Sequence, residues 1–183
     1  MSSSSIDRTV LLPVAFLGAL RAAVESQTAH PGATAPIDAI RDVGYRTGQG
    51  LFAQFGRWLR ERGDAPPEAL PQDRFMVLVD LFFVETGWGG LAALPLSDAV
   101  LALDSSDWAE GVGGGSGCHL STGMLAGFFG SLSDAPLAVL EVECRAAGAG
   151  RCRFLLGSLD VLGAVHAGIT AGQPYRTAVA SAT

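Results

Sequence analysis

Lysine is absent from this chain, and the remaining positive charge is sparse. The 183 residues carry 12 arginines against 18 acidic residues, so the formal net charge is −6 and the pI is about 4.9. Proteins that bind nucleic acid need clustered basic side chains to neutralise phosphates. Because the arginines form no such cluster, we expect no direct contact between this chain and nucleic acid.

Long apolar runs are also missing. Although 49% of the residues are hydrophobic, no uninterrupted stretch reaches the roughly 20 residues that a membrane-spanning helix needs. The N-terminal segment MSSSSIDRTVLLPVAFLGAL has Asp7 where a secretion signal has its basic region, and a helical pattern continues past it without a clear cleavage site. We therefore predict no membrane span and no secretion signal, and interpret residues 1–9 as a disordered tail.

Cysteine and histidine are scarce. Three cysteines are an odd number, which argues against a disulfide framework and favours reduced thiols in the cytoplasm. The three histidines, His30, His119 and His166, are scattered along the chain. No serine-hydrolase, zinc-protease or dinucleotide-binding motif occurs, and the glycine-rich stretch GVGGGSG (111–117) lacks the ending of a phosphate-binding loop. The sequence thus favours a binding protein over an enzyme.

Hydrophobic periodicity indicates an α+β fold. Several helices precede two strands, a helix follows, then two more strands and a last helix, an order typical of an antiparallel sheet covered by helices. Ser158 is the expected N-cap of that last helix. We interpret residues 10–173 as one domain and 174–183 as a loose C-terminal tail. The expected helices include 10–26, 36–62 and one that starts at Cys118, and the expected strands are 87–96, 99–105, 136–144 and 151–157.

Several motifs resemble those of the 4-vinyl reductase domain family. GWGGL, CHLSTGMLAGFFGSL and LEVECRAAGAGRCRFLLGS occur in the expected order, and RDVGYRTGQGLF resembles a Gly-Tyr-rich helix of the family. The resemblance covers roughly residues 35–170. It implies a four-stranded antiparallel sheet with helices, similar to the small subunits of Golgi-transport tethering complexes and often dimeric. In bacterial activators that sense aromatic compounds, such a domain binds the effector and carries a structural zinc. Other members are associated with bacteriochlorophyll synthesis.

The resemblance also implies a ligand set for zinc. Cys118, Glu141, Cys144 and Cys152 match the family's ligands in type and spacing, and three thiolates with one carboxylate fill a tetrahedral structural site. Taken alone, the cysteines could equally be small buried apolar residues. Glu141 and Cys144 are three residues apart, so a regular strand would place them on opposite faces, and the site requires a bulge near 142–143. Glu143 and His119 stay open as alternative ligands.

The helix expected over 36–62 suggests a place for a ligand. Gly44 and Gly48 leave a flat strip on it, where another backbone or a small molecule can approach. Trp88 resembles the tryptophan that lines the effector pocket of the aromatic sensors, but their phenol-anchoring histidine has no match here. A less polar ligand is therefore expected. The predicted ligand-binding residues are Tyr45, Phe82, Phe83 and Trp88.

Three hypotheses for function follow. The first is a stand-alone sensor or carrier domain for a hydrophobic or aromatic molecule, with a structural zinc, a homodimeric state and a separate output protein. The second is an enzyme or accessory factor of tetrapyrrole synthesis that acts in 4-vinyl reduction. The third is a scaffold subunit that uses the fold for pairing alone.

Overall fold

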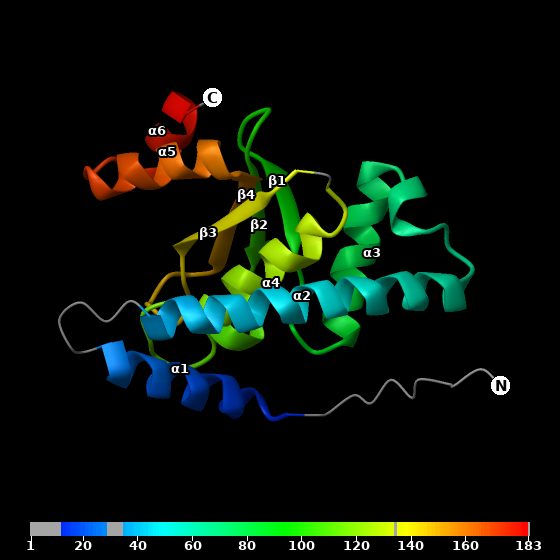
Figure 1. Cartoon of the computed structure of the whole chain (residues 1–183), viewed down its shortest axis with the longest axis horizontal. Coiled ribbons are helices and arrows are strands. Elements are labelled where there is room, and N and C mark those ends of the chain that lie inside the picture. The colour runs from blue at the N-terminus through cyan, green and yellow to red at the C-terminus, as the bar shows by residue number, and fades with distance from the viewer. Residues whose placement is uncertain (1–11, 29–34, 134, 183) are drawn as a thin grey trace.

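The computed structural model describes residues 12–28, 35–133 and 135–182 (Figure 1). It confirms the predicted α+β class, with helices around a four-stranded antiparallel sheet. The interpretation of residues 1–9 as a tail lies outside the described residues. The helices are α1 (Val14–Thr28), α2 (Ala35–Arg62), α3 (Gln72–Glu85), α4 (His119–Gly130), α5 (Leu159–Thr170) and α6 (Tyr175–Ala182), and the strands are β1 (Ala92–Pro95), β2 (Leu101–Ser105), β3 (Leu137–Glu143) and β4 (Cys152–Ser158).

The two predicted hairpins join into one sheet of order β1-β2-β4-β3. The join is the antiparallel pairing of β2 with β4, in which Leu101 lies opposite Leu156. The strand expected over 87–96 is only partly correct, because residues 87–91 form a turn. Gly87 and Gly89 have positive φ angles of 83° and 108°, a conformation that an extended strand does not contain.

Each face of the sheet carries its own hydrophobic core. β4 is buried on both sides, so Phe154 and Leu156 face α2, α3 and α4, whereas Leu155 faces α5 and α6. Figure 1 shows α5 and α6 together at one side of the sheet, away from α2. Ser158 caps α5 as predicted, because its side chain accepts a hydrogen bond from the Val161 backbone at 3.3 Å.

The strip of glycines on α2 is filled by the backbone of α4. A Cβ atom at Gly44 would lie 2.1 Å from the Leu120 carbonyl oxygen, and one at Gly48 would lie 2.0 Å from that of Met124. Gly123 and Gly127 of α4 meet the backbone of α2 in the same way. Of the two occupants considered for this strip, the backbone is therefore the one the structure contains.

The prediction of a loose tail over 174–183 is wrong for the residues of α6. Tyr175 accepts a hydrogen bond from Arg153 Nη1 at 2.6 Å and donates one to Glu143 Oε1 at 2.8 Å. Arg153 in turn binds both oxygens of Asp104 at 2.6 Å. These partners come from three strands and are distant in sequence, so no local pattern could reveal that α6 docks on the sheet. Its buried apolar contacts are Ala178 and Val179.

Candidate metal centre and neighbouring hollows

A β-bulge brings the predicted metal ligands to one side of the β3–β4 hairpin. Glu141 lies opposite Phe154 and Glu143 lies opposite Arg153, so Val142 is an extra residue in β3. The extra residue reverses the alternation of side chains, which lets Glu141 and Cys144 face the same point. The bulge that the ligand set requires near 142–143 is confirmed.

The start of α4 supplies the remaining ligand atom. Cys118 Sγ lies 3.7 Å from Cys144 Sγ and 3.8 Å from Cys152 Sγ. With Glu141, the ligand atoms all lie within 4.8 Å of one another. All three cysteines are buried and free of disulfides. A tetrahedral zinc with Zn–S bonds of about 2.3 Å requires sulfur atoms about 3.8 Å apart, so the thiols already have the spacing for this ion.

The electrostatics of the cluster also fit a cation. Burial raises the pKa of Glu141 to about 8, and hydrogen bonds from Cys118 and Cys144 lower the pKa of Cys152 to about 4. Glu141 Oε2 accepts a hydrogen bond from the Cys118 backbone at 2.6 Å. Its other oxygen is buried without a hydrogen-bond partner among the described residues. Several acidic groups share one buried space, and a divalent cation would neutralise them.

The two alternative ligands point elsewhere. Glu143 Oε1 accepts hydrogen bonds from Arg151 Nη2 at 3.1 Å and from Tyr175. His119 Nε2 lies 3.3 Å from Ser116 Oγ. The geometry therefore favours Glu141 as the fourth ligand.

A buried carboxylate that the sequence reasoning missed holds the start of α4. Glu110 is 3% exposed and accepts hydrogen bonds from the Leu120 and Ser121 backbones at 3.1 and 2.7 Å, and from the Ser121 hydroxyl. It thus satisfies amide groups that the first turn of a helix leaves open. Burial raises the pKa of Glu110. The only local signal is an acidic residue directly before a run of glycines.

The predicted ligand-binding residues do not form one pocket wall. Phe82 and Phe83 are buried core residues whose ring centroids lie 5.7 Å apart. Trp88 is half-buried, and its ring lies 5.9 Å from that of the buried Trp108, which also contacts Phe83. Tyr45 lies apart on α2, with its side chain 42% exposed. Trp88 is thus the member that joins the aromatic core to the surface.

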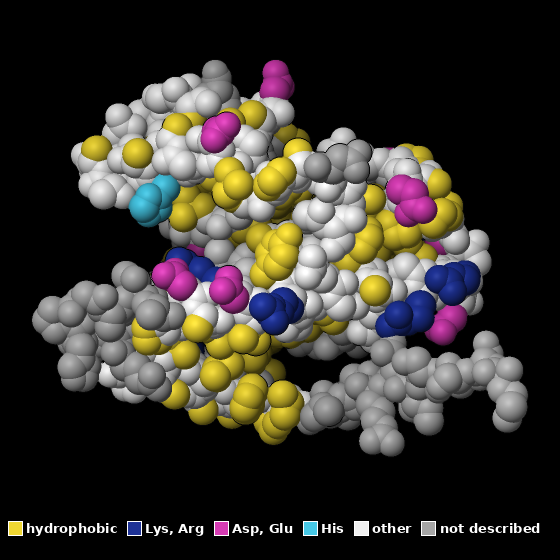
Figure 2. Space-filling model, viewed as in Figure 1, with side chains coloured by type: hydrophobic (Ala, Val, Ile, Leu, Met, Phe, Trp, Pro, Cys, Tyr) yellow, Lys and Arg dark blue, Asp and Glu magenta, His cyan; other side chains and the backbone are white. Residues whose placement is uncertain are grey.

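An apolar groove opens between α3, α4 and the end of the sheet. It has a volume of about 360 Å³, and its floor includes the buried residues Phe75, Phe129 and Leu156. Figure 2 shows hydrophobic side chains at the surface between α3 and the end of α4. None of the described residues that line this groove is charged. Its other lining residues are Gln72, Met76, Leu101, Leu132, Ser133 and Leu137.

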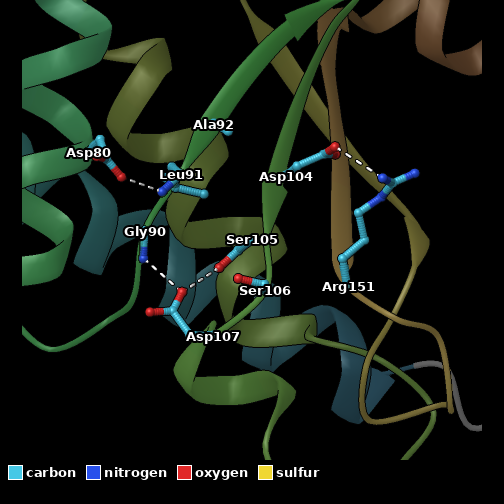
Figure 3. Close-up of a pocket in the computed structure, with 9 residues that line it drawn as sticks. All are labelled: Asp80, Gly90, Leu91, Ala92, Asp104, Ser105, Ser106, Asp107 and Arg151. Carbon is cyan, nitrogen blue, oxygen red and sulfur yellow. Dashed lines mark hydrogen bonds and ion pairs between the residues drawn. The ribbon is translucent and has the colours of Figure 1, made fainter.

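A second hollow is acidic, and its carboxylates have structural partners (Figure 3). Asp80 Oδ1 accepts a hydrogen bond from the Leu91 backbone at 2.7 Å. Asp107 Oδ1 accepts one from the Gly90 backbone at 2.9 Å, and Asp104 pairs with Arg151 at 3.5 Å. The first two carboxylates hold the turn that contains Trp88 against the sheet.

Comparisons with known proteins match this architecture. A sequence model of the 4-vinyl reductase domain matches residues 106–158, which contain Cys118, α4 and the β3–β4 hairpin. The predicted resemblance to the 4-vinyl reductase family is therefore confirmed. No curated protein sequence matches this chain closely enough to count as a relative.

Three solved structures share the fold. The phenol-responsive sensory domain of the transcription activator PoxR, solved with phenol, is 17% identical with a TM-score of 0.63, and the match covers 92% of this chain and 85% of that one. A vinyl-4-reductase family protein from Methanocaldococcus jannaschii is 16% identical with a TM-score of 0.52, covering 85% and 87%. A trafficking protein particle complex subunit 3 from Naegleria fowleri, covalently bound to palmitic acid, is 10% identical with a TM-score of 0.59, covering 79% and 91%.

Proposed function

We propose that this chain, with a 4-vinyl reductase domain match over residues 106–158, binds a small hydrophobic molecule and acts as its sensor or carrier. The observation that carries the proposal is the apolar groove of about 360 Å³ between α3 and α4. Small-molecule sites are typically concave, about 300–1,000 Å³ in volume and lined mostly by apolar side chains. The shared fold with a phenol-responsive sensory domain supports the same function.

Trp88 remains the first predicted contact for the ligand. Two glycines with positive φ flank it in the turn, and its backbone carbonyl accepts a hydrogen bond from Ala109 at 2.8 Å. The ring is thus held at the rim of the aromatic core, with Phe83 and Phe82 behind it and Tyr45 as the outlying member of the proposed set. Trp88 follows α3, whereas the groove lies at the start of that helix, so the two locations can be tested separately.

Trp88→Ala is expected to weaken binding of an uncharged fluorescent probe, N-phenyl-1-naphthylamine, by about tenfold, or ~1.4 kcal/mol. The loss follows from removal of an aromatic contact that is not needed for the buried core. Met76→Glu places a charge in the groove and tests the other location. Val77→Glu is its control, because Val77 is 58% exposed on the outer side of α3.

Each outcome of the titrations has a meaning. Loss in Trp88→Ala alone places the site at the turn, and loss in Met76→Glu alone places it in the groove. Equal affinity of all variants would contradict both locations. A tetrapyrrole absorbance band in the purified protein would instead support the second hypothesis, and a protein that takes up no probe would support the scaffold.

The proposed zinc has a structural role. Cys118, Glu141, Cys144 and Cys152 would fill all four tetrahedral positions and leave none for substrate. The ion would supply a cross-link between the start of α4 and the β3–β4 hairpin. Burial of three unpaired thiols accords with a reducing compartment, so we place the protein in the cytoplasm. Among the described residues, no helix is both long and hydrophobic enough to cross a bilayer.

A homodimer is part of the proposal, and α1 offers a surface for it. Val14 and Phe16 are 42% and 44% exposed on this helix, although apolar side chains of a helix are normally covered. Sedimentation equilibrium is expected to show a dimer that Phe16→Glu converts to a monomer. A wild-type monomer at all concentrations would contradict this assembly. Output through a separate partner protein completes the proposed sensor.

A further inference from the structure

The glycine-rich loop 111–117 touches the candidate metal ligands at both of its ends. A Cβ atom at Gly111 would lie 2.7 Å from Cys152 Sγ, and one at Gly117 would lie 3.1 Å from Glu141 Oε2. The residue that follows the loop is Cys118 itself. The glycines at these ends are therefore explained by close approach to the ligands, and the conformation of the loop sets where Cys118 lies.

The middle of the same loop rests on α1. Arg21 is 4% exposed, and its guanidinium donates hydrogen bonds to the carbonyl oxygens of Val112 at 3.1 Å and Gly114 at 2.8 Å, and to that of Glu110. A Cβ atom at Gly115 would lie 2.2 Å from Arg21 Nε, so the guanidinium lies directly against the loop. Three backbone carbonyls that precede the metal ligand thus depend on one buried cation.

A second tie from α1 lies one turn further on. Glu25 Oε1 accepts hydrogen bonds from the Ser116 backbone at 2.6 Å and from its hydroxyl at 2.7 Å. The backbone hydrogen bond from Ser116 lowers the pKa of Glu25. Since Ser116 is two residues before Cys118, Glu25 restrains the last part of the loop. Arg21 and Glu25 are one helical turn apart and grip successive parts of it.

We infer that Arg21 and Glu25 are positioning residues of the metal site, and that metal binding and docking of α1 strengthen each other through loop 111–117. Five of its seven residues are glycine, so an untethered loop has a large conformational entropy to lose. The metal ligands order its ends and α1 orders its middle. Whichever binds first lowers the entropy cost for the other, and the effect is reciprocal. The inference rests on the proposed zinc.

The first experiment measures release of zinc from the loaded full chain to a chromogenic chelator, 4-(2-pyridylazo)resorcinol. Arg21→Ala and the milder Glu25→Gln are expected to speed release at least about fivefold, the lower end of typical coupling between sites. Arg74→Ala is the matched control, because Arg74 pairs with Asp64 on the exposed surface near α3. It is expected to release zinc at the wild-type rate.

The second experiment measures the reverse direction by hydrogen exchange of the wild-type chain with and without zinc. Removal of zinc is expected to speed exchange in residues 14–28 and 110–117 more than in α5, which lies on the other face of the sheet. Wild-type release rates in both variants, or exchange in α1 that does not respond selectively to zinc, would overturn the coupling. A chain that takes up no zinc would overturn the metal proposal itself, and the coupling with it.

Discussion

Cys152→Ala is expected to abolish zinc binding and to lower the free energy of unfolding by about 4 kcal/mol, the linkage for free zinc at about 1,000 times its Kd. Cys152 starts β4, and its sulfur lies 3.8 Å from Cys118 Sγ. Its loss leaves three ligands and opens the connection between α4 and the hairpin. Metal analysis by mass spectrometry and urea unfolding in the presence of zinc would measure both effects.

Two controls separate loss of metal from loss of packing. Glu143→Gln changes the neighbouring carboxylate that binds Arg151, and it should retain one zinc per chain, whereas Glu141→Gln should not. Wild-type protein in chelator should approach the stability of Cys152→Ala, which should itself be insensitive to chelator. A zinc-free wild type, or a Cys152→Ala variant with full zinc content, would show that these residues are an ordinary buried cluster.

Gly48→Ala should destabilise the fold by at least about 3 kcal/mol, at the upper end of ordinary overpacking. The added Cβ would lie 2.0 Å from the Met124 carbonyl oxygen and 2.7 Å from the Phe128 nitrogen. Both are backbone atoms of α4, so no side chain can rotate away, and the two helices must separate. Urea unfolding followed by circular dichroism would measure the change.

Gly50→Ala is the matched control in the same helix. Within the described part of the chain, no atom lies within 4 Å of a Cβ at this position. Because alanine has the higher helix propensity, this variant should be more stable than the wild type by up to about 1 kcal/mol. Equal stability of Gly48→Ala and Gly50→Ala would show that α4 does not lie against α2 as described.

Most of the metal cluster could be predicted from the sequence, because its signals are local or carried by a motif. The strict alternation of a strand made the bulge at Val142 a necessary consequence of pairing Glu141 with Cys144. The supports of the cluster could not be predicted. Arg21 reaches carbonyls 89 to 93 residues away, and neither it nor Glu25 is part of any recognisable pattern.

The strands of both hairpins, the helix after Ser158 and the absence of a basic cluster follow from the sequence alone, because alternation, caps and charge are local properties. Three features needed the tertiary structure. β2 pairs with β4 through a contact between distant segments, and α6 docks through Tyr175. The glycines of α2 had two open interpretations, and the carbonyls of α4 decided between them. Long-range contacts settle these features because each depends on an atom that no neighbouring residue supplies.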